Sequence, residues 1–172
     1  MKRSDISPMP LFFDRYINLV DDVDILEAFD KYSPNNVFQS LDKLLAVGDR
    51  VYMPGKWTIK DIIQHVIDNE RIMAYRALRF SRKDSTVLPG YDEELLAANT
   101  NTAQRTIGDL MEEFNIVRAG TLALFKNMTN EMLQRSGVAY QNEISALALA
   151  FVIVGHPIHH MRVIEERYFP MI

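Results

Sequence analysis

Residues 144–168 read ISALALAFVIVGHPIHHMRVIEERY, and the predicted fold follows from this stretch. We interpret it as one mostly apolar helix that begins near Asn142 or Glu143 and is stopped by Pro170. Its longest apolar run, residues 144–154, is too short to span a bilayer. We therefore expect a core helix with no membrane contact, in a cytoplasmic protein.

Three of the four histidines in the chain fall within five residues of this helix. His156 and His160 are four apart and share a helix face, and His159, three residues after His156, could share that face instead. A single histidine on an apolar face is usually a hydrogen-bonded core residue. Several buried imidazoles without partners cost roughly 1–3 kcal/mol each, and a divalent metal would satisfy them together. His65 is the one other histidine that could supply a third ligand.

The rest of the chain shows apolar residues at helical spacing. We expect long helices over residues 25–45, 59–82, 102–128 and 143–168, and short helical turns over residues 11–20, 92–98 and 129–134. Pro34 splits the first long helix, because Ser33-Pro34 is an acceptable new helix start. Thr58 is a good N-cap for the second, with Asp61 at the third helical position.

No segment shows sustained alternation of apolar and polar residues, and no Asn-Gly or Asp-Gly hairpin signal is present. A length of 172 residues is typical of one domain. We therefore predict an all-α fold in which residues 1–172 form a single four-helix bundle. Residues 1–10 contain two prolines and are expected to be a poorly ordered lead-in.

Composition excludes several classes of function. The formal net charge is −4 and no run of lysine and arginine is present, so we expect no nucleic-acid partner. The chain has no cysteine, which excludes disulfides, thiolate catalysis by the chain itself and zinc-finger sites. Any thiol chemistry therefore needs a small molecule that brings the sulfur.

Three imidazoles without a carboxylate would leave a bound metal with its full charge of about +2, and such a site suits zinc first and nickel second. Three protein ligands also leave an open position, as in catalytic sites, where a bound thiol would be deprotonated. Asp61 and Asp68 flank His65 on its helix and are candidates for orienting an imidazole or acting as general base, or else for a solvated helix face. Arg76 and Arg79 are interpreted as packing or surface groups. The helical metalloprotease motif His-Glu-x-x-His is absent.

Three blocks of sequence, in this order, resemble one known family. They are KWTIKDIIQHVID at residues 56–68, LPGYDE at residues 88–93, and GH-x3-H with its continuation at residues 155–168. Together they resemble the DinB-like superfamily, and specifically its YfiT-like branch. The resemblance covers roughly residues 11–169 and is weakest before residue 47.

The resemblance implies an up-down-down-up four-helix bundle, often a homodimer, that holds a divalent metal on His65, His156 and His160. It thus favours His160 over His159. Members of that family include S-transferases that add a low-molecular-weight thiol, such as bacillithiol or mycothiol, to small electrophiles. Others are a mycothiol-dependent isomerase and proteins regarded only as metal-dependent hydrolases.

We therefore expect a metal-dependent enzyme that transfers a low-molecular-weight thiol to a small-molecule substrate. A metal-dependent hydrolase is one alternative, and a metal-binding or ligand-binding stress-response protein without turnover is another. Two residues depart from the family pattern. Pro157 replaces a helix-tolerant residue and is expected to bend the last helix beside the metal, and Pro34 breaks a helix that relatives keep continuous.

Overall fold

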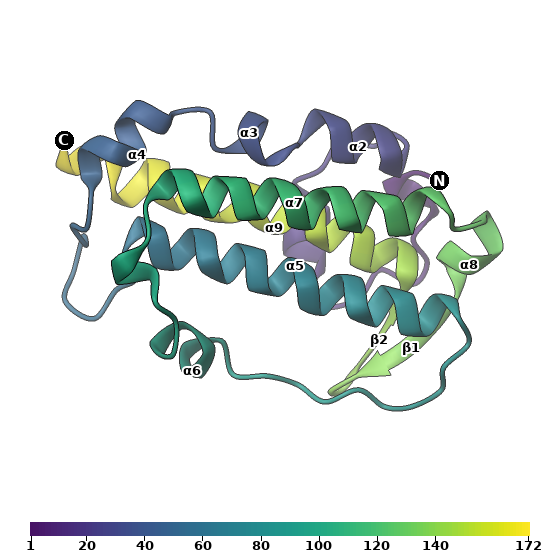
Figure 1. Cartoon of the computed structure of the whole chain (residues 1–172). Coiled ribbons are helices and arrows are strands. Elements are labelled where there is room, and N and C mark those ends of the chain that lie inside the picture. Colours follow the sequence, from purple (N-terminus) through teal and green to yellow (C-terminus); the bar gives the residue numbers. More distant parts are fainter.

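The computed structural model describes all 172 residues and shows three long helices beside a fourth, broken one (Figure 1). The long helices are α5 (Ile59–Ser81), α7 (Ile107–Lys126) and α9 (Ala146–Arg167). The broken side consists of α2 (Ile25–Lys31), α3 (Pro34–Val37) and α4 (Leu41–Val47). The prediction of a four-helix bundle is confirmed, and α3 begins at Pro34, as the predicted split requires.

Figure 1 shows that α5 and α7 run in the same direction, while α9 and the broken side run the opposite way. This is the up-down-down-up order. Because two neighbouring long helices are parallel, residues 82–106 must return along the outside of the bundle. This connection contains α6 (Glu93–Ala98) and the 3₁₀ turn η2 (Thr102–Gln104), and it places Tyr91 and Glu93 beside the bundle.

Side-chain caps set where the long helices begin. The Thr58 hydroxyl accepts from the Asp61 backbone N–H at 3.2 Å, and the Asp61 carboxylate accepts from the Thr58 N–H at 2.9 Å, as the sequence predicts. Thr106 and Asp109 form the same box at the start of α7. The predicted start of α7 at residue 102 is therefore wrong, because the stronger cap lies four residues later.

A β-hairpin precedes α9, and the prediction of a helix from residue 142 or 143 is wrong there. Strands β1 (Ser136–Ala139) and β2 (Asn142–Ser145) pair antiparallel, and Ser145 then caps α9 by accepting from the Ala148 N–H at 3.1 Å. The turn places Tyr140 at φ 57°, a conformation usually given to glycine or asparagine. The sequence therefore carries no standard hairpin signal.

Residues 1–10, where the sequence predicts little order, make specific contacts with the segment before α2. The Met1 amino group lies 2.7 Å from the Asp24 carboxylate, and the Ser4 N–H donates to Asp22 at 2.8 Å. Ile6 is buried in the core. The expected turns over residues 11–20, 92–98 and 129–134 appear as α1 (Asp14–Ile17), α6 and α8 (Asn130–Gln134).

A buried ion pair ties three sides of the bundle together. Arg118 on α7 contacts the Glu70 carboxylate on α5 at 2.9, 3.0 and 3.2 Å. Both residues are almost completely buried, with exposed fractions of 5% and 1%. Arg118 also donates to the carbonyl of Tyr32 at 2.9 Å, which satisfies an acceptor at the end of α2. Arg118 thus contacts the helix break between α2 and α3 from the interior of the bundle.

Arg118→Met is expected to lower the free energy of unfolding by about 3–5 kcal/mol, because it leaves the Glu70 carboxylate buried and unpaired. Urea denaturation measures this change. The double variant Glu70→Leu/Arg118→Met is the matched control and should recover most of the loss. A single variant as stable as the wild type would contradict a structural role for the pair.

Helix α9 is the most apolar element of the chain. By length and composition alone, residues 146–171 could cross a membrane, but 72% of the relevant window is buried inside the bundle. Its apolar surface is therefore used in packing against α1, α2 and α5. This agrees with the prediction of a core helix.

Candidate metal centre

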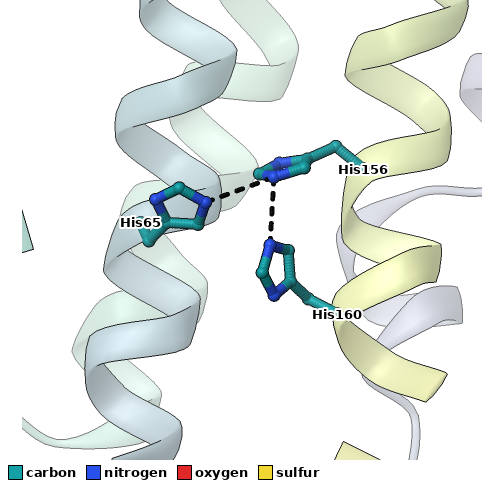
Figure 2. Close-up of side chains that lie close together, drawn as sticks. All are labelled: His65, His156 and His160. Atoms are coloured by element: carbon teal, nitrogen blue, oxygen red, sulfur yellow. Dashed lines mark hydrogen bonds between the residues drawn. The ribbon is translucent and has the colours of Figure 1, made fainter. Parts of the chain in front are cut away.

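Three histidine side chains from two helices point at one another (Figure 2). His65 comes from α5, and His156 and His160 come from successive turns of α9. The Nε2 atom of His156 lies 3.2 Å from Nε2 of His65 and 3.0 Å from Nε2 of His160. The structure therefore brings together the three residues that the sequence and the family resemblance select.

The spacing of these nitrogens fits a small divalent ion. Zinc–imidazole bonds of about 2.0–2.1 Å in a tetrahedral arrangement place ligand nitrogens about 3.3 Å apart. Two of the three separations are close to this value, and all the nitrogens lie within 4.8 Å of one another. Three neutral imidazoles that face each other through Nε2 cannot all be satisfied by hydrogen bonds among themselves. A shared cation would satisfy all three.

Burial keeps these imidazoles in the form that binds metal. Desolvation lowers the pKa of His65 to about 4 and that of His160 to about 3, although the charge of Glu93 partly opposes the shift at His65. Desolvation also lowers the pKa of His156, which is only 3% exposed, well below its ordinary value. All three rings are therefore neutral near pH 7, and few protons compete with a metal there.

The same shifts predict how the metal-free protein responds to acid. Each folded-state pKa lies below the ordinary value of 6.5, so below that pH the unfolded chain binds more protons than the folded one. Stability is then present above pH 6.5 and is lost as the pH falls towards 4, by up to about 1.4 kcal/mol per pH unit for each titrating histidine.

Urea denaturation of metal-free protein between pH 7.5 and 4.5 measures this slope, and the control His65→Asn should reduce it by the contribution of one histidine. Equal free energies of unfolding at the two ends of the range would contradict the role of burial.

Packing, rather than a carboxylate, orients His156. Its Nδ1 atom is buried without a hydrogen-bond partner, whereas a metal-bound imidazole usually donates from its second nitrogen. The Tyr16 ring packs edge-on against the His156 ring, with centroids 5.1 Å apart. Helix α1 can approach so closely because residue 155 is glycine: a Cβ there would lie 2.1 Å from the Tyr16 carbonyl oxygen.

His159 and Pro157 lie beside the cluster but have other surroundings. The His159 ring packs edge-on against Tyr16 at 5.3 Å and is not one of the three converging residues. Helix α9 continues through Pro157, which is buried within it. The proline removes one N–H from the helix without ending it, and both His156 and His160 keep their places on the same face.

The two aspartates proposed to assist His65 are engaged elsewhere. Asp61 belongs to the cap of α5 and also accepts from the Thr102 hydroxyl. Asp68 accepts from Gln64 at 3.0 Å and lies 3.5 Å from Arg71. Neither makes a hydrogen bond to a histidine or lines the cavity at the site. Helical spacing places both aspartates within one turn of His65, but their carboxylates bond to other side chains.

A cavity of about 550 Å³ opens directly on the three histidines. Sequence reasoning missed most of the other polar residues that line it, which include Arg15, Asn69, Arg76, Tyr91, Glu93, Glu94 and Asn142. Trp57 also lines it, with its ring 4.8 Å from the His65 ring and its Nε1 donating to Glu94 at 3.2 Å. The available signal was the family resemblance of blocks 56–68 and 88–93, both of which contribute residues to this cavity.

The fold and the site together define a four-helix-bundle protein with a three-histidine cluster suited to a divalent metal. The sequence profile of the DinB superfamily matches residues 34–164, which is most of the chain. The chain therefore belongs to the DinB superfamily.

Two similar proteins carry related descriptions. One, from Oceanobacillus iheyensis, is named a "putative metal-dependent hydrolase" and is 28% identical over 116 residues, which make up 65% of each chain. The chain thus spans just under two thirds of that relative's length. The other is the solved structure of YfiT from Bacillus subtilis, described as a "probable metal-dependent hydrolase with an unusual four-helix bundle topology". It matches 99% of this chain and 93% of its own with a TM-score of 0.69 and 18% identity, which supports the fold.

Proposed function

We propose that the protein is a divalent-metal-dependent enzyme that activates a small nucleophile at His65, His156 and His160 and transfers it to a small molecule in the adjoining cavity. The observation that carries the proposal is the convergence of three neutral imidazoles in the wall of a cavity large enough for a small substrate. Zinc is our first choice of metal and nickel the second. Such an ion supplies Lewis acidity that lowers the pKa of a coordinated thiol or water.

A low-molecular-weight thiol is the nucleophile that we propose first. The chain has no cysteine to provide sulfur, and no carboxylate hydrogen-bonds to a cluster histidine. A thiol activated by a metal needs no general base in the next step. The thiol would release its proton to solvent on binding. Its sulfur would then form a bond to the electrophilic carbon as the bond to the leaving group breaks, and the leaving group would depart with the electron pair.

Hydrolysis is the second candidate, and one observation favours it. Glu93 lines the cavity and is close enough for its charge to act on His65, so it could accept a proton from an attacking water. Glu94 is less available, because it accepts from the Trp57 Nε1–H. The descriptions of the two similar proteins as hydrolases agree with this candidate.

Substitution of the histidines tests the ligand assignment. His65→Ala and His160→Ala should each abolish stoichiometric metal binding, because two remaining imidazoles hold a divalent ion weakly. His159→Ala is the matched control on the same helix and should keep one metal per chain. Mass spectrometry of dialysed protein measures the stoichiometry. One metal per chain in either of the first two variants would refute the assignment.

A thiol-conjugation assay tests the activity. Metal-loaded protein, offered a panel of small thiols and a chromogenic aryl halide, should form the thioether faster than the uncatalysed background, and His65→Ala should not. Glu93→Gln should leave this rate nearly unchanged but should lower any ester hydrolysis by about 10²-fold or more. If no thiol gives a rate above background, thiol transfer is wrong. Hydrolysis that depends on Glu93 would then select the second candidate.

A further inference from the structure

The chain contains two buried arginines, and only one has a carboxylate partner. Arg118, 5% exposed, is paired with Glu70, whereas Arg76, 6% exposed, forms no salt bridge. Its Nη2 donates to the carbonyl oxygen of Pro89 at 3.0 Å, and its Nη1 contacts the sulfur of Met73 at 3.7 Å. Neither contact neutralises the charge of the guanidinium.

An unpaired buried guanidinium is costly, because arginine stays charged in proteins and is rarely buried without an anion. Desolvation lowers the pKa of Arg76, and the one nearby group that opposes this is the phenol of Tyr91. No carboxylate of the chain contributes. Arg76 also lines the cavity that holds the three histidines. The charge is therefore placed where a ligand can reach it.

Neighbouring side chains hold this guanidinium in position. The Tyr91 ring lies with its centroid 5.6 Å from the guanidinium carbon of Arg76. The Asn69 Nδ2–H donates to the Tyr91 hydroxyl at 2.7 Å, which fixes the ring in turn. Neither glutamate of the cavity pairs with Arg76: Glu94 accepts from the Trp57 Nε1–H, and the charge of Glu93 acts on His65.

The position of Arg76 on α5 sets the distance between its guanidinium and the histidine cluster, where the proposed reaction takes place. It lies eleven residues after His65 on the same helix, a rise of about 16 Å. Its guanidinium contacts Met73, so it reaches back towards the start of the helix. This leaves about 12 Å along the helix axis between His65 and the charge.

We propose that Arg76 is an anion-binding subsite that takes a carboxylate of the substrate, about 12 Å along α5 from the histidine cluster. A planar guanidinium fork matches a carboxylate in two parallel hydrogen bonds. The substrate class is therefore an elongated small molecule with a reacting group at one end and a carboxylate at the other. This inference rests on the proposed function for the placement of the reacting end.

A homologous series of ω-mercaptoalkanoates, compared with ω-mercaptoalkanols of the same lengths, tests the subsite by calorimetry on metal-loaded protein. Above a threshold chain length the carboxylate should bind about tenfold more tightly than the alcohol. Arg76→Gln should remove this preference and leave the affinity for the alcohols unchanged. Arg79→Gln, three residues further along α5 at a side chain paired with Asp84, is the matched control and should keep it.

The wild-type comparison needs no variant, so the test does not depend on the folding of Arg76→Gln. Arg76→Lys keeps the charge but loses the fork and should retain part of the preference. Equal affinity for carboxylates and alcohols at every length, or an undiminished preference in folded Arg76→Gln, would overturn the proposal.

Plain alkanoates and alkanols, measured on metal-free protein, separate this inference from the proposed function. In one outcome, alkanoates bind more tightly than alkanols in a way that depends on Arg76, but thiols bind no better with metal than without it. This would support the subsite and contradict metal-based thiol activation. In the other outcome, thiols bind through the metal and carboxylates have no advantage, which would support thiol activation and contradict the subsite.

Discussion

The contact of three imidazole rings, formed where α9 packs against α5, positions the candidate site within the bundle. The rings meet because His156 and His160 lie one turn apart on a helix that is mostly buried. His65 reaches them because α5 packs along that helix. Removal from water holds the rings neutral, and their mutual approach then favours a shared cation over any arrangement of hydrogen bonds.

The buried ion pair of Arg118 with Glu70 lies away from the cavity. In the cavity wall three polar groups lack a partner of that kind: Nδ1 of His156 and Oδ1 of Asn69 have no hydrogen bond, and Arg76 has no anion. Such groups lower the stability of the empty protein and strengthen its interaction with a complementary ligand. These groups of the cavity wall therefore lower the free energy of unfolding and would favour the binding of a ligand.

Local chemistry allowed much of the fold and of the candidate site to be predicted. The Thr58 cap, the split at Pro34 and the i, i+4 histidine pair each depend on residues within a few positions of one another. The hairpin at residues 136–145 was missed because Tyr140 occupies a turn position that usually carries glycine or asparagine. Arg76 was missed for a different reason: whether an arginine is paired depends on which distant segments cover it, and residues 82–106 could not be placed from sequence. Asp61 and Asp68 were assigned to the site on helical spacing alone, but their hydrogen bonds go mainly to Thr58 and to Gln64, close by in sequence, and not to His65.

X-ray absorption spectroscopy of stoichiometric zinc-loaded protein, with and without a small thiol, is the decisive measurement for the three-histidine metal site. We expect three imidazole nitrogens at about 2.0–2.1 Å in both states, and one added sulfur at about 2.3 Å when the thiol is present. A metal shell with fewer than three imidazoles, or with a protein carboxylate in place of one, would refute the site.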